Sequence, residues 1–258
     1  MLTTFTTGGN TYGIDDRGDG PAIVLYPSLG RAGSDFDELA ASLNAAGFRT
    51  ISVTPPGFVT PPVKSPGWSD LFVIAGELWE IVDHLKIEQP IVVGHAFGNR
   101  VVRTFSTLRP EAVSKLILLA CGGEVPPDES VHETFFRIFD SARSEDERAL
   151  DVKAVFFAPA NEIGDWRFGW DGHLALHQSA AVGATDRSSF YLGGSAPGLI
   201  IQGLDDLIAP PVNSRNLASQ RPDTTLVNLE NCGHAMLPEQ PDRIREEILT
   251  FLSPLLAG

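Results

Sequence analysis

The chain has 258 residues, of which 43% are hydrophobic and 20% charged, as expected for one globular α/β domain carrying an insertion. Its 33 acidic and 19 basic residues give a net charge of −14, which argues against nucleic acid or an anionic membrane as a partner, because both bind concentrated positive charge. The N-terminal stretch MLTTFTTGGN has no basic start or apolar core, and no apolar run approaches the roughly 18 residues of a membrane span, so we predict a cytoplasmic protein.

The first part of the chain predicts a short hairpin region followed by a strand, a helix and a second strand. Two polar stretches, 2–7 and 10–20, are hairpin-like, and a buried strand follows at 22–27. A helix is expected from Asp35 to about Ala46, with Ser34 as its N-cap and Gly47 at its end. The strand at 49–54 leads into a proline-rich loop, 55–66, which is too short to separate two domains.

The second part repeats strand and helix patterns. Asp70 opens a helix whose apolar residues recur at i, i+3 and i+4 spacing. Further helices are expected to begin near Phe97, Val212 and Pro241, the last burying Ile244, Ile248 and Phe251. Strands are predicted at 90–95, 114–120, 198–203 and 224–230. Nearly continuous apolar strands alternating with amphipathic helices predict an α/β fold, with a mostly parallel central sheet covered by helices on both faces.

The alternation is interrupted once, between residues 123 and 194. This stretch is rich in aromatic and charged residues and contains no comparable strand, so we expect a helical cap inserted between two strands. The core then comprises residues 1–122 and 195–258. Most of the aromatic side chains are expected to form the small core of the cap, and a few should face the sheet edge and shape an apolar pocket.

Polar and small residues follow four of the predicted strands. Ligands bind beyond the carboxyl ends of strands in open parallel sheets, so these four segments are expected to meet at one site. The segments are Pro27-Ser28-Leu29-Gly30, Gly94-His95-Ala96-Phe97-Gly98, the stretch GLDDLIAP at 203–210, and Asn231-Cys232-Gly233-His234.

With these four segments in this order, the chain resembles the α/β-hydrolase fold family with a cap domain over nearly its whole length. Gly94 and Gly98 match the family's G-x-S-x-G nucleophile elbow, a tight turn between a strand and a helix. The resemblance implies Asp206, four residues before the proline of its segment, as the catalytic acid and His234 as the catalytic base. It further implies an oxyanion hole formed by the backbone N–H groups of Leu29 and Phe97.

The family's chemistry implies hydrolysis of a small apolar ester, lactone or related carbonyl substrate, without a cofactor. Ala96 departs from it, because alanine occupies the position of the nucleophile. Three interpretations remain open. In the first interpretation, Ala96 is an introduced Ser→Ala change that disables the enzyme. Alternatively, it is native, and His234 with Asp206 performs acid–base chemistry of the lyase or isomerase type. Thirdly, the protein only binds a small molecule, although that interpretation predicts loss of Asp206 and His234, which are both present.

We expect the substrate to be contacted by residues beside the elbow, in the loops and in the cap. His95 belongs to this set, although packing beside the turn is the favoured interpretation for that histidine. The candidates are Ser28, His95, Phe139, Trp166, Trp170 and Met236. A small-molecule substrate is the expected partner, and the sequence leaves a homodimer open.

Neither the cysteines nor the histidines indicate a metal site. Cys121 and Cys232 are too few for a disulfide framework and have no metal-like spacing. His173 and His177 have i, i+4 spacing, but the glutamate of H-E-x-x-H and a third ligand are missing. We therefore predict no bound metal.

Overall fold

The described residues of this computed structural model, 2–59 and 66–255, form one eight-stranded sheet. Its order is β1-β2-β4-β3-β5-β6-β7-β8; β2 pairs antiparallel with β1 and β4, and every other pair is parallel. The strands are β1 (Thr3–Thr7), β2 (Asn10–Arg17), β3 (Ala22–Tyr26), β4 (Arg49–Thr54), β5 (Ile91–His95), β6 (Lys115–Leu119), β7 (Gly198–Gly203) and β8 (Thr224–Leu229).

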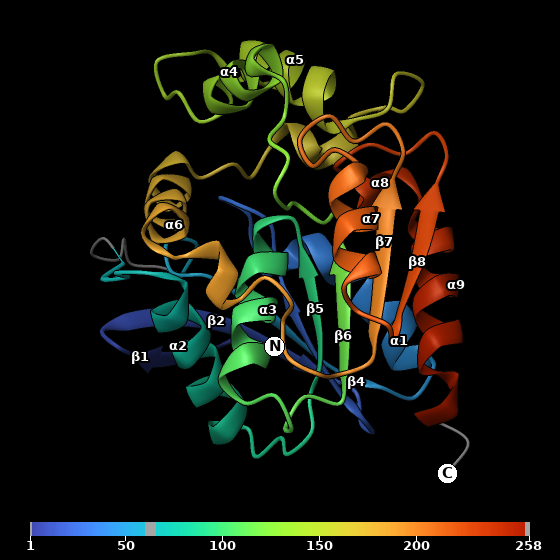
Figure 1. Cartoon of the computed structure of the whole chain (residues 1–258). Coiled ribbons are helices and arrows are strands. Elements are labelled where there is room, and N and C mark those ends of the chain that lie inside the picture. The colour runs from blue at the N-terminus through green and yellow to red at the C-terminus, as the bar shows by residue number, and fades with distance from the viewer. Residues whose placement is uncertain (1, 60–65, 256–258) are drawn as a thin grey trace.

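Helices cover both faces of the sheet (Figure 1). Alternate residues of a strand point to opposite faces, so Val24 and Val92 pack with α2 and α3, whereas Ile23 and Ile91 pack with α1 and α9. The helices are α1 (Asp37–Ala45), α2 (Leu71–His84), α3 (Phe97–Leu108), α4 (Glu129–Arg137), α5 (Glu145–Phe156), α6 (Gly172–Ala184), α7 (Val212–Ser219), α8 (Met236–Glu239) and α9 (Pro241–Leu252). The 3₁₀ segments are η1 (Gly33–Phe36), η2 (Gly164–Arg167), η3 (Arg187–Ser189) and η4 (Ser253–Leu255).

The predicted α/β fold class and its mostly parallel sheet are confirmed. The helix expected to open at Asp70 is present as α2, and Asp70 Oδ1 accepts from Val73 N at 3.0 Å. The N-cap predicted at Ser34 is wrong. The chain first makes the 3₁₀ turn η1, and the Gly33 amide donates to Thr54 Oγ1 at 3.1 Å, so a side chain from β4 satisfies this turn. In α9, Leu252 is fully buried and Phe251 only partly, contrary to the expected core position of Phe251.

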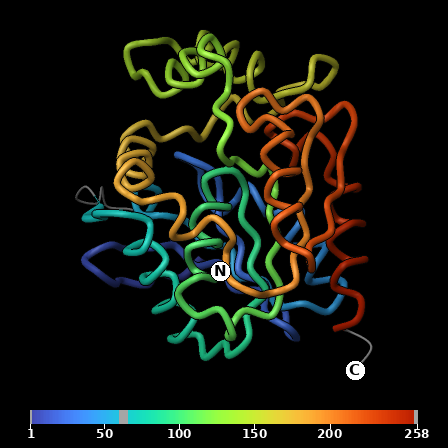
Figure 2. The backbone as a smooth tube through the Cα atoms, viewed as in Figure 1, coloured from blue at the N-terminus to red at the C-terminus, as the bar shows by residue number. Residues whose placement is uncertain are grey.

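A helical insertion lies between β6 and β7. Figure 2 traces the chain from β6 through α4, α5 and α6 and back into β7, and the insertion lies beyond the carboxyl ends of the parallel strands. This arrangement confirms the predicted helical interruption, while the domain boundaries at 122 and 195 stay a prediction. Of the proline-rich loop expected at 55–66, residues 60–65 lie outside the described residues. None of the described helices is long and apolar enough to cross a membrane.

Candidate active site

The turn between β5 and α3 has the backbone of an elbow. Ala96 has φ 52° and ψ −107°, a strained conformation for a residue with a Cβ atom. The turn is also tightly packed, because a Cβ on Gly94 would lie 2.4 Å from Gly98 O, and a Cβ on Gly98 would lie 2.2 Å from Tyr26 O. Glycine at both positions therefore allows β5, α3 and β3 to meet around Ala96.

Asp206 and His234 form a buried pair at the ends of β7 and β8. His234 Nδ1 lies 2.9 Å from Asp206 Oδ2 and 3.0 Å from Oδ1, and each residue is 3% exposed. Asp206 Oδ1 also accepts from the Ile208 and Ala209 amides at 3.0 and 2.7 Å, and Oδ2 accepts from Gln202 Nε2 at 3.1 Å. These donors fix the carboxylate in place. Because Nδ1 is occupied, Nε2 is the ring nitrogen of His234 that can act on a ligand.

The loop that carries His234 is held from the insertion and from α8. Glu239 accepts from the amides of Gly233 and Ala158 at 2.9 and 2.8 Å, and the Ala235 amide donates to Phe156 O at 2.8 Å. Glu239 and Ala158 lie on opposite sides of this loop in sequence. The position of the histidine thus depends on both the core and the insertion.

His95, the last residue of β5, also contacts this loop. Its Nε2 donates to the backbone oxygen of His234 at 2.8 Å, because a carbonyl oxygen can only accept. Burial, with a further contribution from His234, lowers the pKa of His95 to about 3, so the ring is neutral at physiological pH. His95 is completely buried and is not among the residues that line the cavity beside Ala96, which favours the packing interpretation; its assignment to substrate binding stays a prediction.

One cavity of about 300 Å³ brings the predicted catalytic groups together. Ser28, Leu29, Ala96, Phe97 and His234 all line it. Within the described chain, neither the Leu29 nor the Phe97 amide donates to another protein group, so both are free to meet a ligand oxygen. The structure therefore places an elbow, a histidine–carboxylate pair and two backbone donors around one space.

The remaining predicted substrate contacts lie elsewhere. In the aromatic cluster of the insertion, Trp170 packs against Phe139, Trp166 and Phe156, and its ring centroid lies 5.8 Å from that of Phe139. Met236 is fully buried. None of these residues is among those that line the cavity at Ala96, and their assignment to substrate binding stays a prediction. Phe135 and Phe136 of α4 take the aromatic role there instead.

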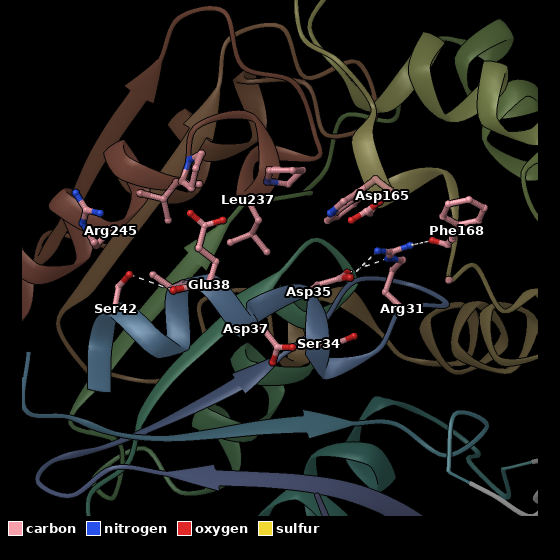
Figure 3. Close-up of a pocket in the computed structure, with 16 residues that line it drawn as sticks. Arg31, Ser34, Asp35, Asp37, Glu38, Ser42, Asp165, Phe168, Leu237 and Arg245 are labelled. Carbon is pink, nitrogen blue, oxygen red and sulfur yellow. Dashed lines mark hydrogen bonds and ion pairs between the residues drawn. The ribbon is translucent and has the colours of Figure 1, made fainter. Parts of the chain in front are cut away.

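Trp166 instead lines a second cavity, of about 440 Å³, together with Arg31 (Figure 3). Arg31 Nε donates to Asp35 Oδ2 at 2.8 Å, and Arg31 Nη1 donates to Phe168 O at 2.5 Å. The guanidinium also lies 4.3 Å from the Trp166 ring centroid. Arg31 thus joins the loop after β3 to η2. We do not assign the active site to this cavity, because neither Ala96 nor His234 lines it.

The sequence prediction missed three polar residues that line the cavity at Ala96. They are Arg100 on α3, His132 on α4 and Ser179 on α6. Arg100 could have been found, because it lies four residues after Ala96 and therefore one helical turn away on the same face. His132 and Ser179 carry no such signal, since their approach depends on how the insertion folds over the sheet.

Cys121 is a buried thiol and does not line the cavity. Burial raises its pKa, so it does not replace the missing nucleophile. Among the residues for which the structure gives positions, no group of three or more His, Cys, Asp or Glu side chains is arranged to hold a metal ion.

Comparison with known proteins gives the chain a family. The sequence model of the "Alpha/beta hydrolase family" matches residues 23–247. A protein described as "Putative carbamate hydrolase RutD", from Pseudomonas syringae pv. syringae (strain B728a), is 27% identical over 253 residues, covering 91% of this chain and 95% of the relative.

Solved structures share the fold. An esterase from Exiguobacterium antarcticum superimposes with a TM-score of 0.85 at 19% identity, covering 98% of this chain and 100% of the esterase. A hydrolase from Pseudomonas aeruginosa PA01 gives 0.82 at 21% identity, with 97% and 98% covered. The family model spans most of the chain, and the elbow, the sheet order and the helical insertion agree with it. The chain belongs to the alpha/beta hydrolase family.

Proposed function

We propose that this site acts on a small apolar ester, lactone or related carbonyl compound, and that its hydrolysis requires the oxygen that residue 96 lacks. The observation that supports this is the cavity shared by Ala96, His234 and the free amides of Leu29 and Phe97. The names of similar proteins, a carbamate hydrolase and an esterase, agree with a carbonyl substrate.

Each group has a role in this reaction. A hydroxyl on residue 96 attacks the carbonyl carbon while His234 Nε2 takes its proton, and Asp206 stabilises the charged imidazole. The amides of Leu29 and Phe97 donate to the oxyanion, worth about 3 kcal/mol each in comparable sites. The imidazolium then protonates the leaving group, and a water molecule activated by His234 releases the acyl group and restores the hydroxyl.

Ala96→Ser tests this proposal. A disabled nucleophile costs on the order of 10⁶ in turnover in a serine-protease triad, so we expect hydrolysis of p-nitrophenyl butyrate to rise by at least about 10³-fold. Adding His234→Ala to the same chain should remove the gain. A serine chain no faster than the unsubstituted one would contradict the proposal.

A second candidate function is acid–base chemistry without a covalent intermediate. It is favoured by one observation, the intact Asp206–His234 hydrogen bond next to an alanine that cannot attack a carbonyl. His234 Nε2 would then move a proton on a bound carbonyl compound. Deuterium incorporation from D₂O into phenylacetone, present in the unsubstituted chain and lost in His234→Ala, would favour this function. Its absence, together with no gain from Ala96→Ser, would leave a small-molecule binding protein.

A further inference from the structure

Arg100 brings a cation to the wall of the cavity. It lies on α3, four residues after Ala96, and both residues line the same space. A Cβ on Gly122 would lie 3.3 Å from Arg100 Nη2, which places the guanidinium beside the segment that follows β6. The cation therefore lies about one helical turn from the elbow, on the side of the cavity next to Gly122.

The guanidinium of Arg100 has no protein acceptor among residues 2–59 and 66–255. Arg100 is half-buried, whereas the fully buried arginines have several acceptors. Arg31 pairs with Asp35, and Arg103 donates to the backbone oxygens of Asn99, Tyr191 and Gly122 at 3.3, 3.1 and 3.0 Å. Taking a charged group partly out of water is unfavourable unless the group is paired. Arg100 is thus an exception, and a bound ligand could supply the acceptor that its guanidinium lacks.

The charge around Arg100 favours an anion. Of the described residues that line the cavity, none is an aspartate or a glutamate, although the chain as a whole carries a charge of −14. Burial, with the nearby charges of Arg103 and Arg187, lowers the pKa of Arg100 to about 10, so it remains charged at neutral pH. His132 and His234 are the other titratable groups in the lining, and neither can neutralise a cation.

We propose that the substrate carries a carboxylate, which the Arg100 guanidinium holds at the Gly122 side of the cavity. The planar guanidinium presents parallel N–H groups that match the two oxygens of a carboxylate. The rest of the wall is mainly apolar, with Phe135, Phe136 and Val182 contributed by the insertion. The substrate is therefore an apolar carbonyl compound with one acidic end. This inference rests on the proposed function only for the position of the reacting carbonyl.

Binding without turnover tests the carboxylate site directly. The unsubstituted chain is titrated calorimetrically at pH 7.5 with phenylacetate, 3-phenylpropionate and 4-phenylbutyrate, and separately with the three matching amides. A charge-assisted hydrogen bond corresponds to about a tenfold to hundredfold gain in affinity, so we expect the best acid to bind at least about tenfold more tightly than its amide.

Variants identify the cation responsible. Arg100→Gln should bring the acid to the affinity of its amide, and Arg100→Lys should retain part of the preference, because lysine keeps the charge but not the planar fork. Arg215→Gln is the matched control: it removes the same charge from an exposed site on α7 and should leave the preference unchanged.

Equal affinities for every acid and its amide in the unsubstituted chain would overturn the proposal, even if Arg100→Gln fails to fold. A preference that persists in a folded Arg100→Gln chain would overturn it as well. If the acids bind through Arg100 but Ala96→Ser hydrolyses no ester, the proposed hydrolysis fails while the carboxylate site stands. The two failures are therefore separable.

Discussion

Two helices that line the same cavity are held in very different ways. Nine of the twelve residues of α3, which follows the elbow, are buried between the sheet and α2. None of the nine residues of α4, in the insertion, is buried, although Phe135 and Phe136 reach the cavity from it. The cavity thus has one wall formed by a buried helix and one formed by a more exposed helix.

The insertion is attached to the core both by polar contacts and by shared hydrophobic clusters. The Gly30 amide donates to Gln178 Oε1 at 2.7 Å, and Asn161 Nδ2 donates to Glu239 Oε2 at 2.7 Å. Apolar side chains cross the same boundary, since Leu174 and Phe190 pack in the cluster of α2 and α3, and Trp166 packs in that of α1 and α9. The position of His234 therefore depends on the insertion as well as on the core, and we expect residues of the insertion to influence the choice of substrate.

The largest expected effect is a loss of kcat when the His234–Asp206 pair is changed, compared with a change of KM when the insertion wall is changed. In the Ala96→Ser chain, Asp206→Asn should lower kcat by about 10⁴-fold, because His234 loses the partner that sets its tautomer. His132→Ala, which changes the insertion wall, should act mainly on KM. Steady-state kinetics with p-nitrophenyl butyrate measures both. An equal loss of kcat in the two variants would break the division between the two walls.

The next largest expected difference is in the free energy of unfolding, and it originates in core packing. Phe105 on α3 is fully buried and stacks on Trp79 with ring centroids 3.9 Å apart, so Phe105→Ala should lower the free energy of unfolding by about 3–5 kcal/mol. Phe136 on α4 is 48% exposed, and Phe136→Ala should change it by less than about 1 kcal/mol. Urea denaturation compares the two. A similar loss in both would show that α4 supports the fold as much as α3 does.

Replacing a glycine by alanine should change the stability in opposite directions in the two regions. Gly98→Ala brings a Cβ to within 2.2 Å of Tyr26 O and should cost about 3 kcal/mol of stability. Gly183→Ala, in the exposed last turn of α6, meets nothing within 4 Å and should stabilise the chain by up to about 1 kcal/mol. Thermal unfolding of the two variants distinguishes these outcomes. Tolerance of Gly98→Ala would contradict the tight packing at the elbow.

A further expected effect is a pH dependence of stability that originates in the core. The pKa of His95 is about 3 in the folded chain and about 6.5 when unfolded, so only the unfolded chain takes up this proton between those values. The contribution of His95 to stability is then constant above about pH 6.5 and falls by about 1.4 kcal/mol per pH unit as the pH decreases toward 3.

His95→Gln should remove that part of the slope. Urea titrations of both chains at pH 7 and pH 5 provide the measurement, and the difference between the chains isolates His95 from the other groups that titrate. Parallel pH profiles for the two chains would mean that His95 is not held neutral by burial.

The sequence by itself was sufficient to predict the sheet and the segments that meet at its edge. Apolar strands, amphipathic helices and the residues after each strand predicted that four segments meet at one edge, and the resemblance to the α/β-hydrolase fold family selected Asp206, His234, Leu29 and Phe97 within them. This worked because parallel strands bring their carboxyl ends to one edge whatever the details of packing. The roles assigned to these residues stay predictions until the variants are measured.

Only the tertiary structure decided which side chains of the insertion reach the ligand. Phe135 and Phe139 lie one turn apart and are equally aromatic, yet the first lines the cavity and the second packs on Trp170. The orientation of a short helix in a cap depends on distant contacts such as Gly30 with Gln178, which no local pattern encodes. Nor does the sequence predict that the Arg100 guanidinium lacks an acceptor among the described residues, because that depends on how distant segments fold around it.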